Sequence, residues 1–270
     1  MSRAHRTRSL LTLAILPAAG LLTLAAPAGA SLVAFDQATD VVYDNGWQSG
    51  DNGGSGFGAW SLNDSGGAGG FFIGSSTNNG GGGTGHIDVA GESWGAYGGG
   101  AGVTATRPLT GALSVGQGID VDFDQGFVDG GPLAGFRFLA TDGSTRFQYN
   151  FLGGTNNYEV RGAANQPTAH GYTPDGMKTS FSLTGTDAFE FKVTYNTGAP
   201  VTETFTGALG GTAGTGIDRI ELFNAHNHGG SDYDAFINAI AVVPEPATIG
   251  LAALAAAMLG ARRARRNGRP

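Results

Sequence analysis

The sequence predicts an all-β protein in which two antiparallel sheets pack as a β-sandwich. Apolar and polar residues alternate over many short stretches, as in strands with one buried and one solvated face. Asn-Gly and Asp-Gly pairs lie between these stretches and favour tight turns. Residues 31–242 contain no convincing helical stretch that could connect parallel strands. Many short strands without helical crossovers favour two stacked antiparallel sheets.

The expected strands are short and alternate residue by residue. The clearest hairpin has Phe136 and Phe138 at alternate positions, an Asp142-Gly143 turn, and renewed alternation over 147–151. Residues 189–195 repeat the pattern before a Thr-Gly-Ala-Pro turn. Further stretches rich in β-branched and aromatic residues predict, in chain order, strands at 87–89, 103–107, 119–123, 158–161, 180–184, 201–206, 217–223 and 236–242.

The body between the two ends of the chain is one domain by this reading. Residues 31–242 show no repeat at a fixed period and no Pro/Ser linker. At this length the strand pattern resembles the jelly-roll sandwiches of concanavalin-like lectins and glucanases. The resemblance is one of architecture and includes no shared motif.

The N-terminus predicts a secretory signal peptide over residues 1–30. Three arginines lie within the first nine residues, an apolar segment follows at 10–24, and small residues end at Ala30. A basic region, an apolar region and an A-x-A-like site in this order are typical of a cleaved signal helix. The alternative is a membrane anchor that stays attached, which Pro17 and Gly20 in the apolar segment disfavour.

The C-terminus, residues 243–270, has three parts in order. Val243-Pro244-Glu245-Pro246 comes first, then an uncharged segment at 247–261. As a helix that segment would span roughly 22 Å, which is short for a permanent membrane span. A basic cluster follows, which the positive-inside rule keeps cytoplasmic; it consists of Arg262, Arg263, Arg265 and Arg266.

The order of Pro-Glu-Pro, short apolar helix and arginine cluster resembles the PEP-CTERM sorting domain. That resemblance implies recognition by a membrane-embedded exosortase, cleavage near Pro-Glu-Pro and release of the body outside the cell. Together with signal peptidase, exosortase would be a partner during export, with the tail inserted transiently in the inner membrane. The implied location is the cell surface or exopolysaccharide matrix of a Gram-negative-type bacterium. A plain tail anchor is the alternative.

The exported body is strongly acidic and free of cysteine. Eight of the 15 basic residues lie in the two ends, and all 22 acidic residues lie between Ser31 and Pro246, so the body has a formal charge of −15. Such a body repels phosphate backbones, which argues against nucleic acid as a partner. The absence of cysteine excludes disulfides and thiolate-bound metals. The sequence requires no cofactor, and Ca²⁺ is the ion that its carboxylates would suit.

Two acidic groups are candidate calcium ligands. Asp120, Asp122 and Asp124 alternate along an expected strand and therefore share one face. Asp232 and Asp234 follow a His-Asn-His triplet around two glycines. Carboxylates brought together in this way can bind Ca²⁺. The alternatives are a solvated outer face for the first group and a hydrophilic loop for the second.

Three aromatic residues are candidates for contact with sugars. Trp60, Trp94 and Tyr97 lie among glycine-rich segments, and exposed rings can stack on sugar faces. The alternative is that they fill the core. Trp94 also belongs to Gly91-Glu92-Ser93-Trp94-Gly95, which matches the G-x-S-x-G pattern of serine hydrolases. No helix follows it, so we interpret the match as a structural turn.

Together these features predict a non-enzymatic surface protein, structural or carbohydrate-associating. The alternative is a polysaccharide-acting enzyme, a glycoside hydrolase or lyase, which for hydrolysis needs two carboxylates flanking one bond. The strand signature of the jelly-roll glucanases, two Glu flanking an Asp at alternate positions, is absent.

Overall fold

The computed structural model describes residues 33–80, 82–100, 102–225 and 230–244. The expected signal helix, the apolar segment at 247–261 and the terminal arginines lie outside the described residues, as does Ala30. Within the described part of the chain, no helix is long and apolar enough to cross a membrane.

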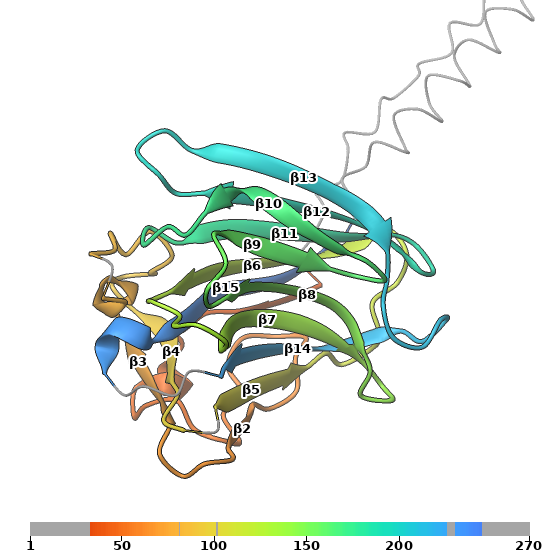
Figure 1. The fold of residues 1–270 in the computed structure, drawn as a ribbon. Coiled ribbons are helices and arrows are strands. Elements are labelled where there is room, and N and C mark those ends of the chain that lie inside the picture. The colour runs from red at the N-terminus through yellow and green to blue at the C-terminus, as the bar shows by residue number, and fades with distance from the viewer. Residues whose placement is uncertain (1–32, 81, 101, 226–229, 245–270) are drawn as a thin grey trace, which may run out of the picture.

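The described residues form fifteen strands and three single-turn 3-10 helices (Figure 1). The strands are β1 (Ala34–Asp36), β2 (Ser61–Asp64), β3 (Gly70–Gly74), β4 (Ser93–Tyr97), β5 (Val103–Pro108), β6 (Gln117–Gln125), β7 (Leu133–Ala140), β8 (Thr145–Leu152), β9 (Asn157–Arg161), β10 (Asn165–Gly171), β11 (Met177–Gly185), β12 (Ala188–Tyr195), β13 (Val201–Ala208), β14 (Ile217–Asn224) and β15 (Ala235–Pro244). The 3-10 helices are η1 (Val41–Tyr43), η2 (Ser76–Asn78) and η3 (Ser231–Tyr233).

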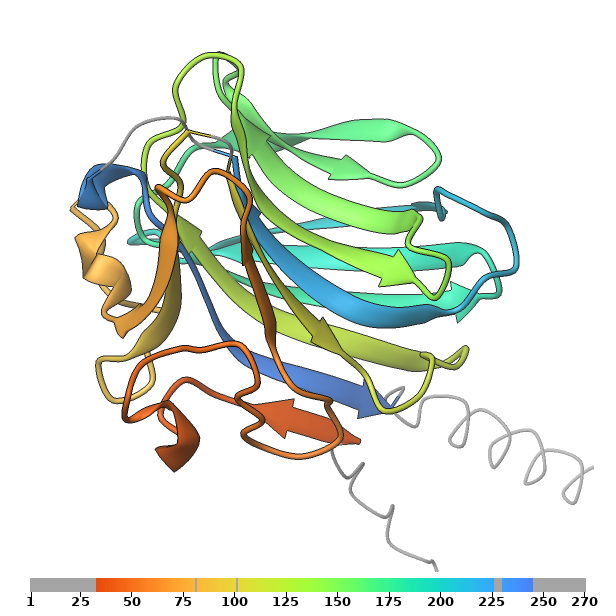
Figure 2. The same ribbon diagram turned by 90° about the horizontal axis from the view of Figure 1, so that it is seen from below.

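The strands form two antiparallel sheets, so the predicted β-sandwich of jelly-roll type is confirmed. The eight-stranded sheet has the order β13-β12-β11-β6-β15-β4-β3, with β1 also paired to β15. The seven-stranded sheet has the order β10-β9-β8-β7-β14-β5-β2. Seen from below, the sheets lie as two layers, with β1 beside the blue strand β15 (Figure 2).

One predicted strand is wrong and several real strands were not predicted. Residues 87–89 lie in a turn that an isolated bridge between Val89 and Glu92 closes. Strands β1 to β4 and β10 are short or irregular, and β3 and β4 contain glycine, which weakens the strand pattern. These strands exist because the sheets supply hydrogen-bonding partners that local alternation does not reveal.

The core between the sheets is aromatic. Phe147 of β8 lies 4.9 Å, centroid to centroid, from Phe191 of β12 and 5.0 Å from Phe181 of β11. Rings at these separations stabilise each other beyond the burial of their area. The alternation of the 136–138, 147–151 and 189–195 stretches therefore places its aromatic face in the core, as predicted.

A β-bulge in β15 shapes the outer face of the eight-stranded sheet. The register between β15 and β6 shifts between Asn238 and Ala241. At the same point the strand paired with the other edge of β15 changes from β4 to β1. Ala239 adopts the left-handed φ of 48° at this point. The Asn238 amide donates to the carbonyls of Ile87 and Glu92, at 3.0 and 2.8 Å. The bulge thus fastens the 86–92 loop beside the sheet.

Candidate functional site

A polar hollow lies on the outer face of the eight-stranded sheet. It is open to solvent, has a volume of about 450 Å³ and crosses five neighbouring strands, from β15 to β13. Four strand spacings of about 4.8 Å give it a span of roughly 19 Å. Its lining consists of Asp120, Asp122, Lys178, Thr179, Ser180, Lys192, Thr194, Thr202, Ala239 and Ala241.

The alternation of β6 places carboxylates in this hollow. Ile119, Val121 and Phe123 are buried in the core, so Asp120 and Asp122 between them face outward. Because β6 lies in the middle of the sheet, both carboxylates lie on the floor rather than at an edge.

Strand register places hydroxyl and amine groups around these carboxylates. On β11, Ser180 pairs with Asp120 and Lys178 with Asp122. On β12, Lys192 pairs with Ser180, and Thr194 pairs with Lys178. The lining therefore combines acceptors, donors and hydroxyl groups that can do both.

Partial burial changes the ionisation of the two floor carboxylates. Burial raises the pKa of Asp122 to about 6, although the nearby Lys178 ammonium, 3.8 Å away, lowers it. Burial also raises the pKa of Asp120, and a hydrogen bond with Ser180 opposes this. One buried oxygen of Asp120 has no hydrogen-bond partner among the described residues. The floor of the hollow is therefore less negative at mildly acidic pH than three aspartates on one strand suggest.

The third predicted aspartate of β6 is not accessible. Asp124 faces the same side of the sheet, but it is buried beneath the loop that contains Asn79. The Asn79 amide contacts both carboxylate oxygens at 3.0 Å, and burial raises the pKa of Asp124 well above its ordinary value. The predicted group of three therefore contributes two carboxylates to the hollow and one to the interior.

The described residues contain no group of three or more His, Asp or Glu side chains placed to hold a metal ion. Asp232 lies in η3, and Asp234 is buried just before β15, where burial raises its pKa to about 7. The His-Asn-His triplet at 226–228 lies outside the described residues.

Two of the three predicted sugar-contacting aromatics are core residues, which corrects that prediction. Trp60 is 2% exposed and Trp94 is 0% exposed, so neither ring has a face for a sugar. They pack against each other with ring centroids 5.4 Å apart. Tyr97 is 38% exposed, and its ring lies over Gly70, where a side-chain carbon would come within 2.5 Å of the phenol.

A buried ion pair holds the N-terminal loop onto this tryptophan cluster. The Arg107 guanidinium lies 2.7 Å from the Asp36 carboxylate, and both side chains are fully buried. Tyr43 donates to Asp36 at 2.6 Å and accepts from the Trp60 indole at 3.1 Å. Burial raises the pKa of Asp36 to about 6, while Tyr43 and Arg107 lower it. The pair is structural, since the Asp36 and Arg107 side chains are closed to solvent.

The G-x-S-x-G match has a structural role, as interpreted. Ser93 begins β4 rather than a helix, and its hydroxyl donates to the Gly74 carbonyl at 2.9 Å. Gly91 has a φ of 86° in the turn before it, which only glycine adopts freely.

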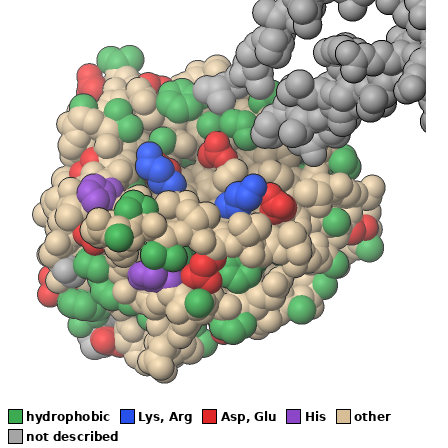
Figure 3. All heavy atoms as spheres, turned by 90° about the horizontal axis from the view of Figure 1, so that it is seen from above, with side chains coloured by type: hydrophobic (Ala, Val, Ile, Leu, Met, Phe, Trp, Pro, Cys, Tyr) green, Lys and Arg blue, Asp and Glu red, His purple; other side chains and the backbone are tan. Residues whose placement is uncertain are grey.

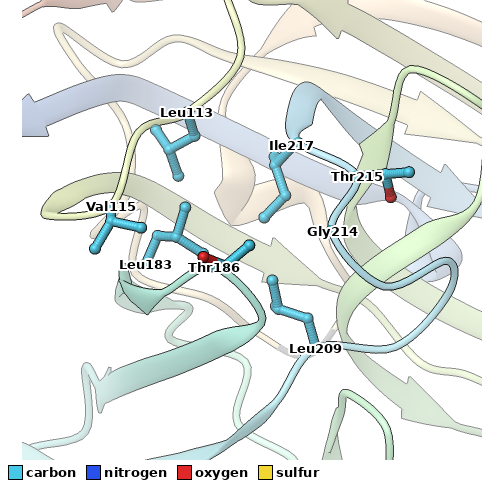
Figure 4. A pocket seen from close by; sticks show the side chains of 9 residues that line it. Leu113, Val115, Leu183, Thr186, Leu209, Gly214, Thr215 and Ile217 are labelled. Atoms are coloured by element: carbon cyan, nitrogen blue, oxygen red, sulfur yellow. The ribbon is translucent and has the colours of Figure 1, made fainter.

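A smaller cavity of about 190 Å³ lies at the end of the sandwich where β11 and β14 approach the 109–117 loop. Leu183, Leu209 and Ile217 point into it from three segments of the chain (Figure 4). The lining is mainly apolar, and it includes no charged side chain. It suits packing more than recognition of a polar ligand.

Sequence reasoning missed the residues that complete the hollow, above all Lys178, Ser180, Lys192 and Thr202. Composition contained one usable signal: the whole chain has only two lysines, and both line the hollow. Their proximity depends on the pairing of β11 with β12, which alternation alone does not reveal.

No protein-family model and no curated protein sequence matches the chain. Among solved structures, a sialidase is 12% identical with a TM-score of 0.49, covering 78% of this chain, which spans 18% of that protein's length. The cellulose-induced protein Cip1 is 12% identical with a TM-score of 0.40, and the match covers 68% of this chain and 90% of Cip1. A pseudo β-1,3-glucanase of Mycobacterium tuberculosis is 9% identical with a TM-score of 0.40, covering 69% and 91%. At these values the likenesses transfer no ligand and no activity to this chain.

Proposed function

We propose that this protein is an exported, non-enzymatic component of the cell surface or extracellular matrix that associates with carbohydrate. The body would bind through the outer face of its eight-stranded sheet, and the two ends would direct its export. The signal peptide and the PEP-CTERM-like tail support export, with signal peptidase and exosortase as the processing partners.

The polar hollow carries the proposal for carbohydrate. Its floor and sides present carboxylate, hydroxyl and ammonium groups from four strands, β6, β11, β12 and β13. These donors and acceptors can form hydrogen bonds with the hydroxyl groups of a sugar. Thr194 and Thr202 continue this lining towards β13, with their hydroxyl oxygens 2.8 Å apart. A span of roughly 19 Å suits a glycan chain better than a single small molecule.

We expect the full chain, kept soluble in mild detergent, to bind polysaccharide through this hollow. Ser180→Tyr fills the floor with a bulky ring and should weaken binding at least about tenfold, which corresponds to about 1.4 kcal/mol. Thr104→Leu on β5 of the other sheet is the matched control. Affinity electrophoresis in gels containing exopolysaccharide, with and without Ca²⁺, measures the effect. Equal retardation of both variants and the parent chain would place the binding elsewhere.

A separate prediction concerns processing at Pro-Glu-Pro. Replacing Pro244, Glu245 and Pro246 together by alanine should leave the protein in the membrane fraction, because the processing site is lost. Pro200→Ala, in a surface turn, should be exported normally. Cell fractionation with one epitope in the body and a second beyond Arg266 reports separately where the body lies and whether the tail has been removed. Normal export of the triple variant would contradict exosortase processing.

A second candidate, a polysaccharide-acting enzyme, is favoured by the two carboxylates of the hollow. Same-face neighbours on a strand lie about 7 Å apart, within the range of about 5–9.5 Å between glycosidase carboxylates. The raised pKa of Asp122 would suit a general acid. Release of reducing ends from bound polysaccharide, abolished by Asp122→Asn, would favour this candidate over simple association.

A further inference from the structure

We propose that the hollow selects anionic polysaccharides, whose carboxylates pair with Lys178 and Lys192. This inference deepens the proposed carbohydrate association and rests on it. The ligand class is a polyuronate or a similarly acidic glycan, bound across β11 and β12.

The distribution of basic residues is the first support. The 270-residue chain contains two lysines, and both line the same hollow. They come from neighbouring strands: Lys192 pairs directly with Ser180, two residues after Lys178. Diagonal neighbours of this kind lie about 7–8 Å apart, so the two ammonium groups can contact adjacent acidic units of one chain.

The lysines of the body differ from its arginines in their exposure to solvent. Every arginine in the described residues is in an ion pair, and their side chains are at most 33% exposed. The pairs are Arg107–Asp36, Arg137–Glu221, Arg146–Asp187, Arg161–Glu159 and Arg219–Asp218. Lys178 and Lys192 are 64% and 54% exposed. They are therefore more open to a ligand than any arginine of the described body.

Each lysine retains capacity for a ligand. The Lys178 ammonium is 3.8 Å from Asp122, and that of Lys192 is 2.7 Å from Glu190. An ammonium has three donors, so one carboxylate neighbour leaves donors for a sugar carboxylate. On the face seen from above, basic side chains are few and acidic ones lie close to them (Figure 3).

The formal charge of the body does not prevent such binding. Salt screens charges beyond about 8 Å, so groups within the hollow dominate. The charged groups facing it are three carboxylates and two ammonium groups, so its formal charge is only −1 when all are ionised, against −15 for the body; they are Asp120, Asp122, Glu190, Lys178 and Lys192. His86 contacts the Asn196 carbonyl just beyond β12.

Protonation of the floor carboxylates adds a pH dependence to anion binding. The pKa of Asp122 is about 6, so acidification from pH 7.5 to 5.5 removes negative charge beside Lys178. A uronate, with an ordinary carboxylic pKa near 4, stays ionised over that range. Anion binding should therefore strengthen on acidification.

The test compares alginate, a polyuronate, with its carboxyl-reduced neutral form, using the full chain in mild detergent. We expect the parent chain to bind alginate more tightly than the neutral form. Its affinity for alginate should fall roughly fivefold in Lys178→Gln or Lys192→Gln and roughly twentyfold in the double variant. Lys178→Arg with Lys192→Arg should retain binding, and Arg219→Gln is the matched control for loss of one charge. Binding should also tighten about threefold from pH 7.5 to 5.5, and it should do so equally in a His86→Asn background that lacks the imidazole near β12.

The outcomes separate this inference from the proposed function. Equal binding of both polymers, unaffected by the lysine variants, would overturn the anion preference and leave carbohydrate association intact. Failure of the parent chain to bind either polymer would contradict both. If the Lys→Gln variants bound both polymers more weakly by the same factor, the anion preference would also be overturned. The lysines would then support the structure of the site without pairing with a sugar carboxylate.

Discussion

Asp36→Asn is expected to destabilise the folded protein by about 3–5 kcal/mol at pH 7.5. The substitution keeps the size of the side chain but removes the charge that compensates Arg107, which is fully buried. Arg107 would keep its hydrogen bonds to the carbonyls of Asp51 and Gly53, at 3.0 and 2.8 Å, and its position over the Trp60 ring. None of these contacts supplies a negative charge. Urea unfolding followed by tryptophan fluorescence measures the change.

Asp218→Asn is the matched control for this effect. Its partner Arg219 is partly accessible to solvent, with 31% of its side chain exposed, so loss of the ion pair should cost at most about 1 kcal/mol. The Arg107→Met variant should be destabilised as well, and the double variant by less than the sum of the two, because the residues interact directly. If Asp36→Asn and Asp218→Asn lowered the free energy of unfolding by the same amount, the buried ion pair would contribute no more to stability than the partly exposed one.

Trp94→Ala is expected to cost about 3–5 kcal/mol, because it removes the largest fully buried side chain from the core. Its ring packs edge-on against Tyr43, with centroids 5.3 Å apart, so the loss would also loosen the N-terminal loop. Tyr97→Ala, three residues further along β4 and on the opposite, exposed face of the sheet, should cost about 1 kcal/mol or less. Urea unfolding again gives the comparison.

The milder Trp94→Phe variant separates packing from recognition. It retains a ring in the core and should bind polysaccharide as tightly as the parent chain, because the Trp94 ring does not reach solvent. A specific loss of binding in a folded Trp94→Phe protein would instead restore the original prediction that this residue contacts sugar.

The strands that the sequence predicted best are those with one aromatic face. In β8 and β12, Phe147, Tyr149, Phe189 and Phe191 recur every second residue, and all four lie in the core. The period of a strand is a local property, so neighbouring residues suffice to reveal it. By contrast, β3 and β4 show no regular alternation of apolar and polar residues. There Gly70 of β3 pairs with Tyr97 of β4, and the Tyr97 ring packs over the glycine.

The candidate site was predictable only in part. The shared face of Asp120 and Asp122 followed from their spacing along one strand and is confirmed. The burial of Asp124 under Asn79, 45 residues away in the chain, did not follow from that spacing. The tryptophans failed as surface candidates for a similar reason: glycine-rich surroundings indicate loops, but the ring at each position packs inward against distant segments.

The sequence by itself determined the all-β class, the polar and apolar faces of its regular strands, and the acidic, cysteine-free character of the body. These properties depend on residue identity and on spacings of two along one strand. The tertiary structure alone decided which faces meet: the pairing of β6, β11 and β12 brings Asp122, Lys178 and Lys192 into one hollow. Register between strands is set by the packing of the whole core, so contacts across it cannot be inferred from any single strand.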